Sequence, residues 1–216
     1  MLGRNNDMKI SIARYSVPYI LVFLILSIVF YALFWPIGIV FSAFLLFTIF
    51  FFRDPERTIP QEPNIILSPA DGKVMSVEEI EEDKFLKSRA RKVSIFLSLF
   101  DVHINRVPFS GTVKYKKYIK GKFVPAYKKE APLINERNEV GIDCGNIKIL
   151  VTQIAGIVAR RIICNINNNE KVSLGDRFGM IKFGSCTEIV FPANVELKVK
   201  VGDKVKGAET IIGVVK

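Results

Sequence analysis

The sequence predicts a mostly β domain, antiparallel and barrel- or sandwich-like, that follows an N-terminal hydrophobic α-helical hairpin. Two observations support this prediction. Residues 15–52 contain no Asp, Glu, Lys or Arg, whereas the rest of the chain holds short β-type runs separated by Gly, Pro and Asn turns. Because the composition changes at Arg53, we expect two parts in the 216-residue chain: residues 1–52 and residues 53–216.

The uncharged run of 38 residues is too long for one membrane-crossing helix. As a single helix it would extend to roughly 57 Å, whereas one crossing needs about 20 residues. Its middle contains Trp35-Pro36-Ile37-Gly38, a sequence that breaks helices. We therefore predict two helices, about Val17–Trp35 and Ile39–Phe52, which either span the membrane or re-enter one leaflet.

Basic residues flank this run on both sides, with Arg4, Lys9 and Arg14 before it and Arg53 and Arg57 after it. Positive flanks favour the cytoplasmic side, so we predict a cell-membrane protein whose β domain is cytoplasmic. Of the net charge of +10, about +8 lies after residue 52, which favours anionic lipid headgroups as partners. Nucleic acid is not expected, because no nucleic-acid-binding motif is present.

The three cysteines, Cys144, Cys164 and Cys186, have no CxxC spacing and cannot all pair. This usage fits a reducing compartment. With one histidine in the chain, we expect no metal site. Cys186 is interpreted as a small buried residue rather than a nucleophile.

Short apolar or β-branched runs at regular spacing predict the strands of residues 53–216. The runs are Ile65–Leu67, Gly72–Val77, Lys92–Leu97, Gly111–Tyr118, Val140–Cys144, Ile147–Ile154, Arg161–Cys164, Met180–Phe183, Thr187–Phe191, Glu196–Val201 and Thr210–Val215. Glu78–Arg91 is the most helix-like segment of this part. The turns in Ser68–Val74 and Val199–Gly207 resemble those of lipoyl and carrier folds, but no carrier lysine motif is present, so they indicate fold rather than function.

A Gly184-Ser185 peptide bond lies between two of these runs. Glycine enters strained backbone conformations without a Cβ clash, so the serine hydroxyl can approach the preceding carbonyl. A hydroxyl in that position can attack its own peptide bond and convert the amide to an ester. Elimination would then leave a pyruvoyl group at Ser185, a cofactor made from the chain itself. The alternative interpretation is a Gly-Ser turn in a β-hairpin.

Two further residues complete a candidate catalytic trio with Ser185. His103, the only histidine, follows an apolar run, and Asp71 lies in a Pro-Ala-Asp-Gly turn. In such a trio the His takes the serine proton and the Asp fixes the imidazole tautomer. The G-x-S-x-G motif of α/β-hydrolases is absent, so Ser185 is better explained as attacking its own chain. The alternative is a structural histidine and an ordinary Asp-Gly turn.

Four ordered motifs extend over most of the chain. They are Ser68-Pro69-Ala70-Asp71-Gly72, Phe100-Asp101-Val102-His103-Ile104-Asn105-Arg106, Gly156-Ile157-Val158-Ala159-Arg160-Arg161 and Arg177-Phe178-Gly179-Met180-Ile181-Lys182-Phe183-Gly184-Ser185. Each alone is weak, but in this order they are specific. On these motifs the chain resembles the phosphatidylserine decarboxylases of the short prokaryotic type, and archaetidylserine decarboxylases are close siblings.

The resemblance implies a lyase of phospholipid biosynthesis that converts phosphatidylserine to phosphatidylethanolamine. It implies a zymogen that cuts itself between Gly184 and Ser185, leaving residues 1–184 and 185–216 associated. His103, oriented by Asp71, would deprotonate Ser185. The resulting pyruvoyl cofactor would form a Schiff base with the substrate amine.

The resemblance also suggests which basic residues bind the lipid phosphate. Arg160, Arg161 or Lys182 would do so, since Arg offers bidentate geometry; the alternative is a paired or surface charge. A homodimer is compatible with the sequence. A non-catalytic, membrane-tethered carrier-like β module stays open as a different class of function.

The chain departs from the long-form members of the family at two places. It has Phe183-Gly184-Ser185-Cys186 where the long forms have Leu-Gly-Ser-Thr, so the Gly-Ser bond is kept. It has Arg106 where the long forms have a second histidine, the expected base for self-cleavage. Which residue is the base for self-cleavage therefore stays open, and His103 is a candidate for both maturation and turnover.

Overall fold

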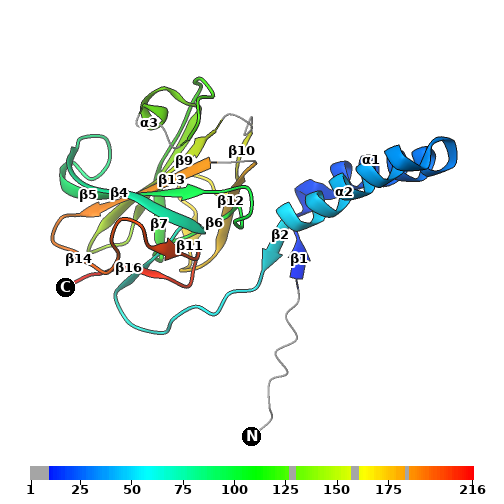
Figure 1. The fold of residues 1–216 in the computed structure, drawn as a ribbon. Helices are drawn as coiled ribbons and strands as arrows, with labels where there is room; N and C mark the ends of the chain where they lie inside the picture. The colour runs from blue at the N-terminus through cyan, green and yellow to red at the C-terminus, as the bar shows by residue number, and fades with distance from the viewer. Residues whose placement is uncertain (1–9, 127–129, 157–160, 183–184) are drawn as a thin grey trace, which may run out of the picture. The chain divides into compact units, whose positions relative to one another are not determined.

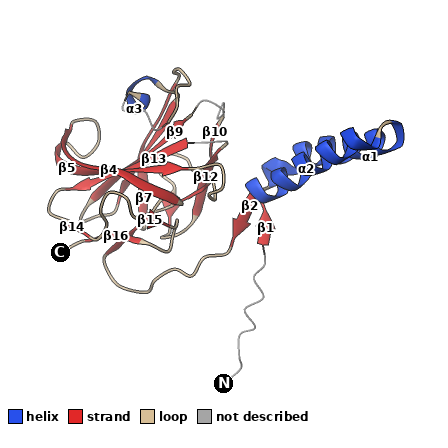
Figure 2. Cartoon of the chain, viewed as in Figure 1, coloured by secondary structure: helices blue, strands red, loops and turns tan. Residues whose placement is uncertain are grey.

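The computed structural model describes residues 10–126, 130–156, 161–182 and 185–216. The chain divides into two compact units, Met1–Glu56 and Arg57–Lys216. Helices make up most of the first unit and strands most of the second, as Figure 1 and Figure 2 show. The mostly β fold with an N-terminal apolar helical hairpin is therefore confirmed.

The hairpin consists of α1 (Val17–Leu33) and α2 (Trp35–Phe51), preceded by the short 3-10 helix η1 (Arg14–Ser16). The break between the helices is at Phe34, whose backbone is extended with φ −158° and ψ 93°. The predicted break at Trp35–Gly38 was wrong by a few residues. Pro36 begins α2 rather than ending α1, because the first turn of a helix has no partner for the N–H that proline lacks.

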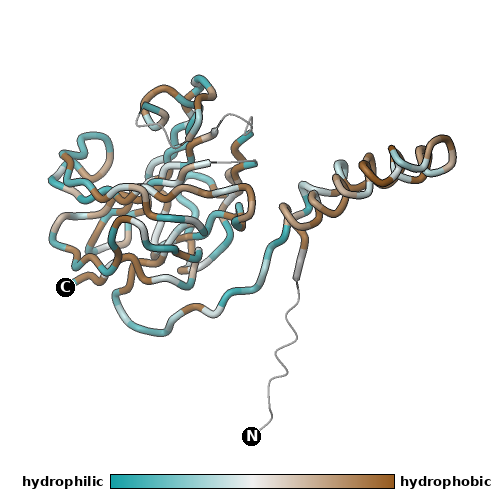
Figure 3. The backbone as a smooth tube through the Cα atoms, viewed as in Figure 1, coloured by the Kyte–Doolittle hydropathy of each residue, from teal (hydrophilic) through white to brown (hydrophobic). Residues whose placement is uncertain are grey.

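The two helices pack through stacked rings and one polar pair. Ser27 Oγ and Ser42 Oγ are 2.6 Å apart, and the rings of Phe23 and Phe44 stack at 5.6 Å. Figure 3 shows the hydrophobic colouring of both helices. Among the described helices, one segment, Arg14–Leu33, is long and apolar enough to cross a membrane.

A two-stranded ladder joins the two ends of the hairpin. β1 (Ile10–Ile12) pairs antiparallel with β2 (Arg53–Pro55), and the amide of Ala13 donates to the carbonyl of Phe52 at 2.9 Å. The chain therefore enters and leaves the hairpin at the same end.

The second unit contains an eight-stranded antiparallel sheet that curls into a half-barrel (Figure 1). In spatial order its strands are β11 (Lys171–Val172), β7 (Gly111–Ile119), β8 (Arg137–Asp143), β9 (Lys148–Ala155), β13 (Ser185–Pro192), β5 (Ser88–Leu97), β4 (Gly72–Glu82) and β15 (Lys204–Val205). The short helix α3 (Ala131–Ile134) precedes β8.

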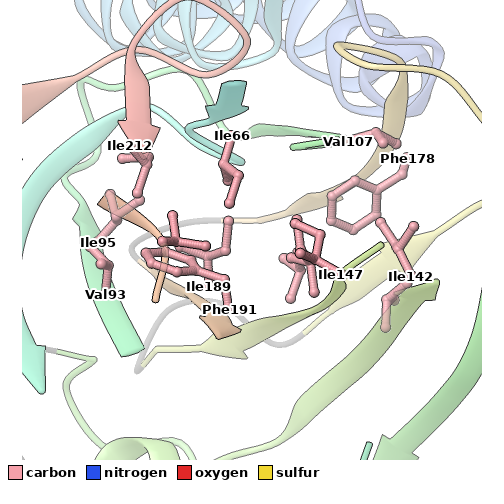
Figure 4. Packing of buried hydrophobic residues seen from close by; sticks show 14 of the residues in the cluster. Ile66, Val93, Ile95, Val107, Ile142, Ile147, Phe178, Ile189, Phe191 and Ile212 are labelled. Carbon is pink, nitrogen blue, oxygen red and sulfur yellow. The ribbon is translucent and has the colours of Figure 1, made fainter. Parts of the chain in front are cut away.

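Two three-stranded sheets accompany the large sheet. One has the order β10 (Ile162–Cys164), β12 (Arg177–Ile181) and β6 (Ile104–Arg106), and the other has the order β14 (Glu196–Leu197), β16 (Ile211–Val214) and β3 (Ile65–Leu67). The main core unites residues of all three sheets, among them Ile66, Ile95, Phe178, Ile189 and Phe191 (Figure 4).

The helix expected over Glu78–Arg91 is absent, and the segment forms the end of β4, a turn and the start of β5. Its charges pair across strands, as Glu79 does with Arg89 at 2.8 Å and Glu78 with Lys92 at 3.0 Å. The sequence prediction was wrong because opposite charges three or four residues apart suit a helix, whereas here they meet across a hairpin.

Candidate active site

Ser185 is the first residue of β13 and is fully buried. In the sheet it lies between Leu97 of β5 and Ala155 of β9. Its Oγ makes no hydrogen bond to any group in the described part of the chain. A buried hydroxyl without a partner costs about 1–3 kcal/mol and is uncommon in folded proteins, so it calls for a functional explanation.

The chain changes sheets just before Ser185. β12 belongs to the sheet of β6 and β10, whereas β13 belongs to the eight-stranded sheet. The two strands are therefore not the arms of one β-hairpin, and the simple turn interpretation of this segment is wrong. Phe183 and Gly184 lie outside the described residues, as does Arg160.

His103 lies directly before β6 and is fully buried. Its Nδ1 is 2.9 Å from the carbonyl oxygen of Asp101. A carbonyl oxygen only accepts, so this hydrogen bond places the proton of a neutral imidazole on Nδ1 and the lone pair on Nε2. This tautomer suits a histidine that acts as a base through Nε2.

Two contacts join the segment around His103 to the chain before and after Ser185. The amide of Ile181, four residues before Ser185, donates to the carbonyl of His103 at 3.3 Å. The side chain of Asn105 donates to Thr187 Oγ1 at 3.0 Å. Because side chains two residues apart on an extended strand share a face, Ser185 lies on the face of Thr187. Ser185 therefore faces the layer between β13 and β6, and the buried His103 directly precedes β6.

Buried amides fill the rest of this layer. Gln153 of β9 donates to Asn105 Oδ1 at 2.8 Å, and Asn138 of β8 donates to Gln153 Oε1 at 3.0 Å. A Cβ at Gly179 of β12 would lie 2.8 Å from Gln153 Nε2, so only glycine leaves room for this amide. With Thr187, these amides form a connected polar row that fixes β13 against β6 and β9.

Asp71 lies in the turn before β4, where its carboxylate is bound by Arg57. Arg57 Nη2 donates to both carboxylate oxygens at 2.9 and 2.8 Å, and the amide of Gly207 donates at 2.8 Å. Burial raises the pKa of Asp71 above its usual value although Arg57 acts in the opposite direction, and the charge of Asp101 adds to the rise. The role of Asp71 in orienting His103 stays a prediction.

The remaining basic candidates have different surroundings. Lys182 is buried and its amide donates to the carbonyl of Arg161 at 3.3 Å, whereas the side chain of Arg161 is exposed. Arg106 lies on the face of β6 opposite Asn105, and its Nη1 donates to the carbonyl of Gly175 at 3.3 Å. Arg106 therefore does not replace a histidine beside Ser185.

Cys186, the neighbour of Ser185, faces the other side of β13. It is fully buried in an apolar cluster with Ala126 and Ile154. Burial raises the pKa of its thiol well above the usual value, so it stays a thiol and not a nucleophile. Within the described ranges, no group of three His, Cys, Asp or Glu residues is arranged to hold a metal ion.

Sequence reasoning missed several contributors to this site. Gln153 lies in the mostly apolar run Ile147–Ile154, where a polar residue was the available signal. Asn138 lies beside the charged Glu139 and Thr187 beside the charged Glu188, so the sequence marks neither of them in this way. Arg57 was noted as a membrane-flanking charge, but its side chain is only 6% exposed and binds Asp71.

Comparison with known proteins identifies relatives along most of the chain. The family model for phosphatidylserine decarboxylase matches residues 44–213. The phosphatidylserine decarboxylase proenzyme of Symbiobacterium thermophilum is 44% identical over 203 residues, which cover 94% of each chain. The proenzyme of Carboxydothermus hydrogenoformans is 49% identical over 184 residues, which cover 85% of this chain and 86% of its own. The proenzyme of Wolbachia pipientis is 42% identical over 212 residues, or 94% of this chain.

Proposed function

The chain belongs to the phosphatidylserine decarboxylase family, and from this premise we propose that it decarboxylates phosphatidylserine with a pyruvoyl group made from its own Ser185. The observation that carries the proposal is the buried Ser185 Oγ, which lacks a hydrogen-bond partner among the described groups. This hydroxyl faces the layer between β13 and β6, and the only histidine of the chain directly precedes β6. The relatives are named proenzymes, which is consistent with a chain that matures by cleavage.

Self-cleavage begins with transfer of the Ser185 proton to His103 Nε2. The serine oxygen attacks the Gly184 carbonyl carbon, the peptide C–N bond breaks, and the nitrogen takes the proton, which leaves an ester. Loss of the Cα proton of residue 185 breaks its Cβ–O bond, so Gly184 leaves as a carboxylate. Water then hydrolyses the remaining dehydroalanine. Its nitrogen departs as ammonia, and the carbon that held it becomes a ketone. Arg106 cannot act as the base, since a guanidinium stays protonated.

The strand pairing supports continued association of the two products. In the 185–216 product, β13 pairs with β5 and β9, β15 pairs with β4, and β16 pairs with β3. Each of these partner strands belongs to residues 1–184. The ladders and the core therefore hold the small chain in place after its covalent link is cut.

In turnover, a pyruvoyl group at residue 185 supplies a ketone that condenses with a primary amine and then serves as an electron sink while carbon dioxide leaves. His103 would return a proton to the substrate α-carbon. Lys182 and Arg161 lie beside the cleavage segment and would bind the lipid phosphate, and Arg160 stays a candidate from sequence alone.

The apolar hairpin accounts for the location that we propose. It would hold the enzyme at the cell membrane with the β domain on the cytoplasmic side, where basic flanks are favoured. A lipid substrate makes such an anchor useful, whereas a soluble amino acid does not. An ether lipid with the same headgroup, archaetidylserine, would present the same amine and carboxylate. The bacterial relatives favour phosphatidylserine, and the family favours an enzyme over a carrier module.

The test is an assay of the purified full chain with vesicles that contain phosphatidylserine. We expect release of carbon dioxide and formation of phosphatidylethanolamine, and no release with Ser185→Ala. The matched control is Cys186→Ala, which should be processed and active because its side chain faces away from the site. Absence of carbon dioxide release by processed enzyme from both ester and ether lipids would overturn the proposal.

A separate test concerns Arg161. Its substitution with Ala should raise the KM for phosphatidylserine in vesicles if this side chain binds the lipid phosphate.

A further inference from the structure

The turn that leads from β5 into the site has an unusual composition. Ser98 and Asp101 close it, because Asp101 Oδ2 accepts from the Ser98 amide at 2.8 Å and from the Ser98 hydroxyl at 2.7 Å, and the Asp101 amide donates to the Ser98 carbonyl at 3.0 Å. The two central residues are Leu99 and Phe100, which are 39% and 70% exposed. Turn centres normally carry Gly, Pro, Asn, Asp or Ser. A well-fixed turn therefore presents two large apolar side chains to the outside.

A second apolar projection lies at the same end of the sheet. Ser185 is flanked by Leu97 and Ala155, and Asn135 Nδ2 donates to the Ala155 carbonyl at 2.7 Å. Asn135 directly follows α3, whose residues Leu133 and Ile134 are 75% and 37% exposed. The Leu99–Phe100 turn thus follows β5, and α3 is bound through Asn135 to the end of β9. These two strands lie on either side of β13. Strands lie about 4.8 Å apart, so both projections rise close to Ser185.

Exposed apolar residues of the β domain concentrate at this end. The large exposed hydrophobic residues described between Arg57 and Lys216 are Leu99, Phe100, Tyr118, Leu133, Ile134 and Val201. Tyr118 lies on β7, opposite Asn138 of the polar row, and so belongs to the same end. Val201 lies beyond the edge of the sheet, before β15, and is the exception. Such a concentration on a soluble-type domain indicates a surface that binds something apolar.

Basic side chains border the same end. Lys120, Lys122 and Arg161 are exposed. Lys122 is tied to α3, because its amide donates to the Ile134 carbonyl at 2.7 Å. Arg161 adjoins Lys182, which precedes the cleavage segment. Exposed apolar side chains with basic residues beside them suit a bilayer that carries anionic headgroups. The apolar side chains enter the boundary of the acyl chains, and the basic side chains bind the phosphates.

We propose that this rim, formed by Leu99, Phe100, Leu133 and Ile134 with the basic residues beside it, inserts into the surface of an anionic bilayer. The rim is a second membrane contact, made by the β domain itself and separate from the helical hairpin. It would bring the Ser185 end of the sheet to the headgroups, so that a lipid need not leave the bilayer to reach the site. The inference does not depend on the chemistry performed at Ser185.

The test places a fluorescent reporter in the full chain. Trp35, the only tryptophan, is replaced by Phe, and Phe100→Trp is introduced. The protein is reconstituted in vesicles of phosphatidylcholine and phosphatidylglycerol whose acyl chains carry bromine, with no phosphatidylserine present. We expect a blue-shifted emission, strong quenching by the brominated chains and protection from acrylamide. Val201→Trp in the same background is the matched control, and we expect it to stay open to acrylamide and unquenched by bromine.

Equal acrylamide access and no bromine quenching for both reporters would overturn the proposal. Protection of Phe100→Trp that needs no lipid and grows with protein concentration would also overturn it, because a second copy would then cover the rim. A variant without a new tryptophan provides an independent check. Leu99→Ser with Phe100→Ser should keep the melting temperature within a few degrees but raise KM several-fold for substrate in vesicles, with kcat on short-chain dispersed substrate unchanged. An equal loss on both substrates would contradict a membrane role.

Discussion

The two faces of β13 carry equally buried polar side chains that are put to different uses. Ser185 and Thr187 face the inter-sheet layer, whereas Cys186 and Glu188 face the other side of the sheet. All four are less than 10% exposed. Burial alone therefore does not identify the reactive residue of this strand.

The difference lies in how each polar group is satisfied. On the outer face, Glu188 accepts from Ser94 Oγ at 3.0 Å and lies 3.7 Å from Lys92 Nζ. On the inner face, Thr187 is bonded to the amide row, but Ser185 Oγ has no partner among the described groups. A satisfied buried group stabilises the fold, whereas an unsatisfied hydroxyl that faces the layer beside β6 is available for chemistry.

The largest contrast is expected between His103 on the inner side and Glu188 on the outer side. His103→Gln removes the base and should slow self-cleavage by at least about 100-fold, the usual scale of general-base catalysis. Glu188→Gln keeps the volume and should leave the cleavage rate within about twofold, because it lies across the sheet from Ser185. A time course of chain cleavage on denaturing gels measures both. Equal rates for the two variants would remove His103 from the mechanism.

A smaller contrast is expected in stability, measured by urea unfolding in an uncut Ser185→Ala background. Asn105→Ala leaves Thr187 without its donor and takes one acceptor from Gln153, so it should cost about 3 kcal/mol. Ser94→Ala removes one donor from Glu188, which keeps Lys92, so it should cost about 1 kcal/mol. If the two costs were equal, the inner row would hold β13 no more firmly than the outer contacts do.

The smallest effects are expected from two buried carboxylates of the outer face, whose pKa values are shifted in opposite directions in the folded state. Burial alone would raise the pKa of Glu139, but hydrogen bonds from Lys84 and Tyr115 outweigh it and lower the pKa. Its contribution to stability is thus complete above the usual Glu pKa and is lost as pH falls through the lowered value. Burial raises the pKa of Glu188 although Lys92 acts in the opposite direction, so the folded state holds the carboxyl proton more tightly than the unfolded chain does. The free energy of unfolding therefore falls as the pH rises from the usual Glu pKa through the raised one.

Unfolding free energies between about pH 3 and about pH 7 test these signs. Glu139→Gln should flatten the loss of stability on the acid side, and Glu188→Gln should remove the loss that accompanies ionisation. The Ser185→Ala background again keeps the chain uncut. If the two substitutions changed the pH dependence of unfolding in the same direction, the partners assigned to Glu139 and Glu188 would be contradicted.

Local sequence signals predicted the elements that depend on local physics. The uncharged run became the helical hairpin, and the strand at Ile65–Leu67 was predicted to the residue. The helix at Glu78–Arg91 was wrong because its charges satisfy helical spacing and cross-strand pairing equally well, and Phe85, buried in the turn, favours the hairpin. Pro36 was taken for a helix breaker although it also starts helices.

The site was only partly accessible from sequence, since its contacts are long-range. The chemistry of a lone His and a Gly-Ser bond pointed to His103 and Ser185. The row that fixes them joins Asn105 to Thr187 across 82 residues and to Gln153 across 48. No pattern along the chain encodes such pairings, because the curl of the sheet and the packing of β6 over it bring them together.

The mass of the small chain tests the central claim most directly. Purified wild-type protein, kept native until it is dissolved for intact-mass spectrometry, should give residues 1–184 and residues 185–216. The second chain should be lighter by one ammonia than a peptide that begins with serine, and borohydride should add two hydrogens to it. A single chain of 24.4 kDa, or a small chain that begins with an unchanged serine, would contradict the account.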